Sequence, residues 1–332
     1  MAADSTPFLW KRWAVFAAKL VILLVVAVGI GRAVWVSLDQ FREQKISLAD
    51  IHWGWFAACG SLYLLGMAPA CFFWHRTLWA MGQRPAFWES LRAFYLSQLG
   101  KYVPGKAMVV VLRSAAIASD RVDPVVAAVS VFVETLTMMA AGALVATAIL
   151  AGIFHEHTGL MLIALGLMAL AGVPTAPPIF KRVVKLLRVK KANPKIDEAL
   201  DGITWRLMLE GWLIDGAGWC VMGLSLWTAL RATPGLDLSQ LYTVESLLLV
   251  IASMALATVA GFLSLIPGGF GVRDLVVVTL IGVQFGSVAA IVSAVLMRLA
   301  SLLAEVGVSG LLYLIRPPTP VESSTASQAE VS

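Results

Sequence analysis

Charged side chains are scarce in this sequence. Among its 332 residues, 25 are Lys or Arg and 20 are Asp or Glu, which makes 14% of the chain. Soluble domains carry about 25% charged residues, and a soluble chain of this length would need far more polar surface to cover its core. The scarcity of charge excludes a soluble enzyme and a nucleic-acid-binding domain, so we expect no nucleic-acid partner.

Residues that build disulfides, metal centres and catalytic sites are also few. The three cysteines lie within apolar stretches as small packing residues, and a secreted disulfide scaffold is excluded. Two of the four histidines belong to the run 155–157, whose spacing differs from that of a helical zinc site and which we interpret as a solvated loop. The sequence contains no Walker motif and no Ser/His/Asp signature. We therefore expect no metal, no cofactor, no ATP use and no catalytic residue.

Long apolar runs are what the sequence has in abundance. Apolar residues make up 59% of the chain and occur in blocks of about 20, the length that spans a bilayer as a helix. Only helical bundles and closed barrels span membranes, and barrel strands would alternate polar and apolar residues. The blocks here are continuous, as in VILLVVAVGIG. The sequence therefore predicts an all-α polytopic membrane protein.

Seven apolar stretches are long enough to be spans, and two shorter segments interrupt them. The predicted spans cover residues 14–38, 53–79, 124–153, 160–177, 207–230, 241–266 and 287–315. The shorter segments, 87–118 and 267–282, each contain a Pro-Gly pair. We expect about six to eight transmembrane helices in one domain over residues 1–316, followed by a short, polar, disordered tail at 317–332.

The distribution of Lys and Arg predicts the orientation. These residues concentrate between 76 and 121 and again between 181 and 206, and basic loops face the cytoplasm. We therefore place residues 181–203 and both termini on the cytoplasmic side of a bacterial cytoplasmic (inner) membrane. The basic run 181–191 is either a loop that fixes this topology or an amphipathic helix that lies on anionic head groups.

The two Pro-Gly segments belong to an internal repeat. Pro104 precedes Glu134 by 30 residues, Pro267 precedes Arg298 by 31, and a small-residue-rich span holds each charge. The spans that precede the two segments are predicted to run in opposite directions, so repeat 1 (53–153) and repeat 2 (205–315) are inverted. Each Pro-Gly pair then forms the tip of a re-entrant helical hairpin, a pattern of transporters. The alternative is a pair of Pro-kinked helices without a cavity.

Charges inside the apolar spans are candidates for function. Glu134 and Arg298 lie near the middle of their spans, where a charge costs at least about 2.5–3.5 kcal/mol. They either meet as an ion pair between the two repeats or separately face other groups. Asp215 and Glu305 are also deep in their spans, and Glu305 follows Arg298 on the same helix face. A buried ion pair need not stabilise a protein, so we interpret these charges as functional or as fixing the arrangement of the halves.

The predicted substrate-binding residues surround the two tips and include the charges within the spans. They are Lys101, Pro104, Gly105, Lys106, Arg113, Glu134, Pro267, Gly268, Gly269, Gly271, Arg273, Asp274, Arg298 and Glu305. The cations at the first tip either hold a phosphate or anchor the topology.

Several of these motifs also resemble a known family. They are Gln98-Leu99-Gly100-Lys101-Tyr102-Val103-Pro104-Gly105-Lys106, Arg113, Glu134, Ile266-Pro267-Gly268-Gly269-Phe270-Gly271-Val272-Arg273-Asp274 and Arg298. The pattern resembles the lysylphosphatidylglycerol synthase transmembrane region family, described as flippase-like, over about residues 14–316. The first motif departs from the common Pro-Gly-Gly-Asp-like form, so no acidic role is assigned to that tip.

The resemblance implies a membrane domain that binds or translocates lipids or lipid-linked sugars. In the synthases proper, a separate soluble domain adds the amino acid. These 332 residues hold no such domain, so synthase activity is not implied. We expect a lipid flippase or transporter for an anionic head group. The alternatives are a membrane-embedded lipid-modifying enzyme with Glu134 as base, or a partner that presents lipid to a separate enzyme.

Overall fold

The computed structural model describes residues 47–103, 107–153, 158–264, 266–269 and 271–315, with isolated residues between 24 and 44. Within these ranges the chain is α-helical and contains no β-strand. The all-α prediction is therefore confirmed. The predicted span at 14–38 and the tail at 317–332 lie outside the continuous described ranges.

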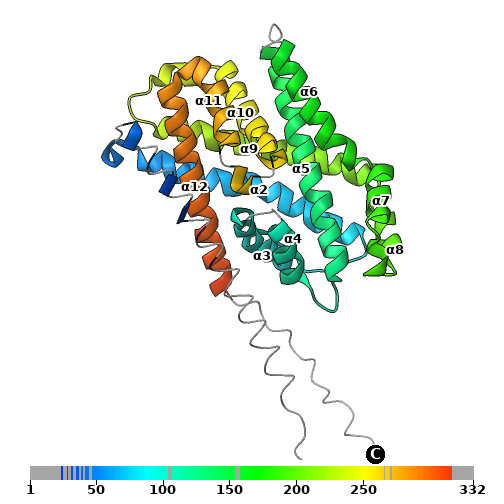
Figure 1. The fold of residues 1–332 in the computed structure, drawn as a ribbon. Helices are drawn as coiled ribbons and strands as arrows, with labels where there is room; N and C mark the ends of the chain where they lie inside the picture. Colours follow the sequence, from blue (N-terminus) through cyan, green and yellow to red (C-terminus); the bar gives the residue numbers. More distant parts are fainter. Residues whose placement is uncertain are drawn as a thin grey trace, which may run out of the picture.

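Two long helices that pack along each other form the centre of the fold. They are α2 (Trp53–Ala80) and α9 (Trp205–Ala232), each 28 residues long. At one end the His52 amide donates to the Ala232 carbonyl, and at the other Gly202 lies against the Ala80 carbonyl. The two helices are therefore antiparallel over their whole length. In Figure 1, α2 crosses the molecule between α12 and α5, both of which it contacts.

Each central helix is followed by a helical hairpin and then by another long helix. The first set is α3 (Phe87–Gln98), η2 (Leu99–Tyr102), α4 (Ala107–Ile117) and α5 (Pro124–Ile153). The second set is α10 (Val244–Leu263), η6 (Pro267–Gly269), α11 (Val272–Phe285) and α12 (Ser287–Leu314). The short helices η2 and η6 contact each other, so the two hairpins meet tip to tip.

The helix contacts show an internal two-fold relation. Exchanging α2 with α9, α3 with α10, α4 with α11 and α5 with α12 converts the contacts of one half into those of the other. For example, α3 packs on α12 as α10 packs on α5, and α2 packs on α12 as α9 packs on α5. Because the equivalent helices α2 and α9 are antiparallel, the halves are inverted.

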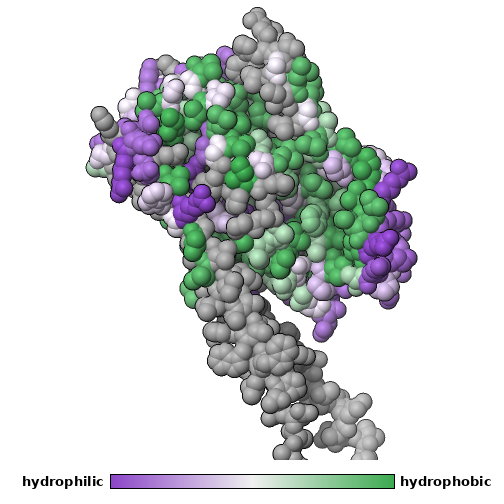
Figure 2. All heavy atoms as spheres, in the orientation of Figure 1, coloured by the Kyte–Doolittle hydropathy of each residue, from purple (hydrophilic) through white to green (hydrophobic). Residues whose placement is uncertain are grey.

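Between the halves the chain forms α6 (Thr158–Gly172), α7 (Pro177–Leu186) and α8 (Ile196–Asp201). The basic run therefore begins in a helix and does not form a loop throughout. Phe180 and Val184 of α7 are buried, whereas Val183 and Leu186 are exposed. Figure 2 shows hydrophilic side chains around α7 and α8, next to a broad hydrophobic surface. The helix α7 is thus amphipathic, as helices that lie at a membrane interface are.

The predicted spans agree closely with the helices. Five described helices are long and apolar enough to cross a membrane: α2, α5, α9, α10 and α12. The predicted span at 160–177 becomes α6, which has 15 residues and is shorter than a typical span. The remaining described elements are short 3-10 helices: η1 (Leu48–Asp50), η3 (Val173–Thr175), η4 (Val189–Lys191) and η5 (Leu238–Tyr242).

Candidate functional site

A cavity of about 400 Å³ lies between the first hairpin, α5 and the tip of the second hairpin. Most of its lining is apolar, including four methionines, which adapt readily to ligands of irregular shape. Four charged side chains also line it: Lys101, Arg113, Glu134 and Arg273. The tip of the second hairpin contributes Gly268 and Gly269 to the lining of the cavity. Its mixture of long apolar walls and a few charges fits an amphipathic ligand.

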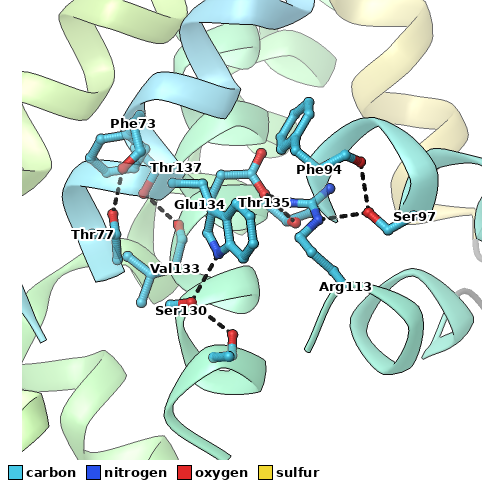
Figure 3. A network of polar contacts seen from close by, with 12 residues as sticks. Phe73, Thr77, Phe94, Ser97, Arg113, Ser130, Val133, Glu134, Thr135 and Thr137 are labelled. Atoms are coloured by element: carbon cyan, nitrogen blue, oxygen red, sulfur yellow. Dashed lines mark hydrogen bonds and ion pairs between the residues drawn. The ribbon is translucent and has the colours of Figure 1, made fainter. Parts of the chain in front are cut away.

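The first charged pair joins Arg113 of α4 to Glu134 of α5. The Arg113 Nη1 atom donates to the Glu134 Oε2 atom at 2.6 Å, and both side chains are about 2% exposed. Arg113 Nε donates to the Ser97 hydroxyl at 2.9 Å, and Thr135 donates a further hydrogen bond to Glu134 (Figure 3). The Phe94 ring, whose centroid lies 4.3 Å from the guanidinium carbon, adds a cation–π contact. The charges are compensated within the first half.

Of the two alternatives for Glu134 and Arg298, the direct ion pair is wrong. Arg298 of α12 forms its ion pair with Asp274 of α11, whereas Glu134 pairs with Arg113. The physical reason is the packing of each hairpin. Its second helix lies directly against the long helix that follows, so Glu134 and Arg298 each meet a partner inside their own half.

The two ion pairs are equivalent under the internal two-fold relation, with their signs reversed. In the first half, α4 supplies the cation and α5 the anion. In the second half, α11 supplies the anion, Asp274, and α12 the cation, Arg298. Each long helix therefore pairs with the hairpin helix before it, and Glu134 and Arg298 have opposite signs because the cation lies on α4 in one half and on α12 in the other. Each pair fixes the position of one hairpin on the adjacent long helix.

We expect the second pair to show energetic coupling. Asp274→Asn and Arg298→Gln should each lower the melting temperature of the purified protein. The double variant should lose less than the sum of the two, because either single change already breaks the pair. Thermal unfolding of the four proteins in detergent measures the coupling. Additive losses would mean that the two side chains do not act as a pair.

A second polar cluster joins the two halves. Lys101 of η2 forms an ion pair with the fully buried Glu305 of α12. The Tyr63 hydroxyl donates to Glu305 Oε1 at 2.6 Å, and the Tyr102 hydroxyl donates to Oε2 at 3.0 Å. Both carboxylate oxygens are thus satisfied, which offsets the cost of burying the charge. This cluster connects the first tip to the last helix of the second half.

The second tip owes its shape to glycine. Gly268 and Gly269 have φ values of 63° and 69°, and both line the cavity. A Cβ atom on Gly269 would lie 3.1 Å from the Gly261 Cα atom, so the tip also packs closely on α10. Gly271, with a φ of 80°, precedes α11 as its N-cap and donates its amide to Asp274 at 3.1 Å. Pro267 opens η6.

Not every predicted site residue lies in the described part of the chain. Pro104, Gly105 and Lys106 fall outside the described residues. Of the remaining eleven, Lys101, Arg113, Glu134, Gly268, Gly269 and Arg273 line the cavity of about 400 Å³. Asp274 and Arg298 line a smaller adjoining cavity of about 30 Å³, which Lys101, Gly268, Gly269 and Arg273 also line.

Arg273 differs from the other cavity cations. It forms no ion pair with any carboxylate in the described part of the chain, and its Nη2 atom lies 3.5 Å from the Met254 sulfur. Its charge is thus available to an anion that enters either cavity. Tyr63 and Ser97 are residues that the sequence alone did not indicate. Neither lies in a repeated motif, and nothing in their local sequence indicates a polar contact.

Comparison with known families agrees with this architecture. Residues 14–308 match the family described as lysylphosphatidylglycerol synthase TM region. The chain belongs to this family. The match covers both inverted halves, with both hairpins and the cavity between them, and it shows a multi-pass membrane protein. No curated protein sequence matches the chain.

Proposed function

We propose that this family member moves lipids with an anionic head group across the bacterial cytoplasmic membrane. The observation that carries the proposal is the cavity of about 400 Å³, whose apolar walls surround Arg273, a cation with no carboxylate partner in the described chain. A phosphate-bearing head group would bind there, because guanidinium groups bind phosphate through several hydrogen bonds. The apolar walls of the cavity would contact the acyl chains of the lipid.

The inverted halves supply the route. In transporters built from inverted repeats, the substrate binds near the midplane between the repeats, and one half moves relative to the other. Here the two hairpins meet tip to tip, and the charged residues collect at that junction. We therefore place both tips within the membrane as re-entrant hairpins. When one half moves and the cavity opens to the other side of the membrane, the contacts between Lys101 and Glu305 would break, because they join the two halves.

A lipid-modifying enzyme receives less support. Glu134 would have to act as its base, yet its carboxylate accepts hydrogen bonds from Arg113 and Thr135. These contacts occupy the carboxylate oxygens, and Glu134 would have to break them before it could take a proton from a substrate.

The test is lipid movement in vesicles. Purified protein is reconstituted with fluorescent lipids carrying anionic, zwitterionic or cationic head groups, and an impermeant quencher reports those exposed outside. We expect faster movement of anionic lipids, and a rate about tenfold lower for Arg273→Gln, because one charged hydrogen bond contributes about 1.5–3 kcal/mol.

The matched control is Arg206→Gln. This arginine is 90% exposed and forms a surface ion pair with Glu210 on α9, away from the cavity, so its loss should leave the rate unchanged. Equal rates for vesicles with and without protein, over the whole set of head groups, would contradict the proposal.

A further inference from the structure

A buried acid beside the cavity has no part in the arrangement described so far. Asp215 lies in α9, is 2% exposed, and neither of its carboxyl oxygens has a hydrogen-bond partner in the described part of the chain. The other buried acids, Glu134 and Glu305, each have a cation and hydroxyl donors. Asp215 is thus the exception among the buried acids in the described part of the chain.

The neighbours of Asp215 place it where α9 meets α2 and α5. One turn before it, Gly211 packs on the Phe73 ring of α2. One turn after it, Gly218 packs on Gly66 and Pro69 of α2, and Trp219 donates to the Met138 carbonyl of α5 at 2.9 Å. This helix junction adjoins the cavity, which Met138 also lines.

The charged and titratable groups around Asp215 include no compensating cation. On α5, Glu134 acts on it electrostatically, and this carboxylate is paired with Arg113. On α2, the titratable side chain between Pro69 and Phe73 is the buried thiol of Cys71. Along α9 itself, Glu210 is bound by Arg76 and Arg206.

The helices that pack farther along α9 place their charges elsewhere. Glu245, at the start of α10, is the charged residue of that helix. Arg298 and Glu305 belong to α12, which contacts α9 near Ser225, ten residues or about 15 Å along the helix from Asp215.

An acid in this setting holds a proton. A bare carboxylate in a water-excluded span, without donors or a cation, is far costlier than the neutral acid. Binding of an anionic head group changes the setting, since the anion competes with Glu134 for Arg113. Glu134 would then carry a negative charge without its cation, and its electrostatic effect on Asp215 would become stronger. Substrate binding and proton binding are therefore linked.

We propose that Asp215 binds one proton from one side of the membrane and releases it to the other in each transport cycle, coupling lipid movement to the pH gradient. The coupling rests on the proposed lipid transport. No covalent bond changes: the carboxyl group gains and loses the same proton. Proton movement of this kind is a known role for isolated acids in transporters.

The experiment uses the full-length protein in vesicles that contain a labelled anionic phospholipid and hold a difference of one pH unit. With one proton coupled to each lipid, the ratio of the lipid between the two leaflets should change by up to about tenfold, since one pH unit is a tenfold driving force. Asp215→Asn should still equilibrate the lipid but show no change of the ratio with pH. Glu210→Gln, an acid on the same helix held in a surface ion pair, should respond like the unaltered protein.

The outcomes separate the two proposals. If lipid moves but the gradient leaves the ratio unchanged in the unaltered protein, the coupling is wrong and lipid transport stands. If no lipid moves under any condition, lipid transport is wrong. Infrared spectroscopy then decides the protonation independently: the protein in detergent at neutral pH should show a protonated carboxyl band that shifts in Asp215→Glu and persists in Glu210→Gln. Absence of that band in the unaltered protein would overturn the inference. This test does not need the Asp215→Asn variant, so it also applies if that variant fails to fold.

Discussion

Replacing Arg113 by Gln is expected to destabilise the protein by about 3–5 kcal/mol, because it leaves the Glu134 carboxylate buried without its cation. Glu134→Gln should cost a comparable amount, since it strands the guanidinium between Phe94 and Ser97. Lipid movement should fall below detection in both variants, because the pair holds α4 on α5 at the wall of the cavity. Thermal unfolding in detergent and the vesicle assay measure the two effects.

The double variant Arg113→Gln, Glu134→Gln gives the decisive comparison. With both charges removed, no unpaired charge is buried, so the double variant should be more stable than either single one. The control is Glu210→Gln, which breaks the surface ion pairs with Arg76 and Arg206 and should cost no more than about 1 kcal/mol. If the losses of Arg113→Gln and Glu134→Gln are additive, the buried pair does not have the role assigned to it.

A charge exchange tests the corrected pairing. Glu134→Arg combined with Arg298→Glu should not restore stability, because Glu134 and Arg298 each have a partner in their own half. The exchange Arg113→Glu with Glu134→Arg should restore part of it.

The sequence predicted the membrane helices well because their signal is local. The predicted span 124–153 coincides with α5, and 53–79 differs from α2 by one residue. The span at 160–177 fits less well, because α6 ends at Gly172 and the next residues form η3, which contains Pro174. The length of an apolar run shows that a membrane helix is present, whereas the residue at which the helix ends depends on the turn that follows.

The sequence relates the two halves through Pro104 and Pro267, which lie at matched distances from Glu134 and Arg298. It does not show which partner each of those charges meets. Sequence equivalence shows which positions correspond, but two equivalent positions face each other only if they lie near the two-fold axis. The central glycines of α2 and α9 do so, whereas Glu134 and Arg298 face the hairpin helix of their own half.

Gly66→Val is the second change with a large expected effect, because Gly66 lies at the centre of the antiparallel pair α2 and α9. Gly66 and Gly218 are each the fourteenth residue of their helix, and Gly218 packs on the Gly66 carbonyl. A Cβ atom on Gly66 would lie 2.4 Å from the Met222 Cγ atom and 2.8 Å from the Met222 amide nitrogen. The side chain of Met222 could move, but its backbone cannot without separating the two helices.

A matched pair of alanine variants shows the sign of the effect. Gly54→Ala, in the same helix, meets no atom within 4 Å and should stabilise the protein by up to about 1 kcal/mol through helix propensity. Gly66→Ala should instead destabilise it by about 1–3 kcal/mol through overpacking, and Gly66→Val by more. Thermal unfolding of the three variants checks the order; a Gly66→Ala protein as stable as Gly54→Ala would contradict the close approach. The two halves meet at this contact, so forcing α2 and α9 apart there should also displace the hairpin tips and the cavity walls. Gly66→Val should therefore lose lipid movement together with stability.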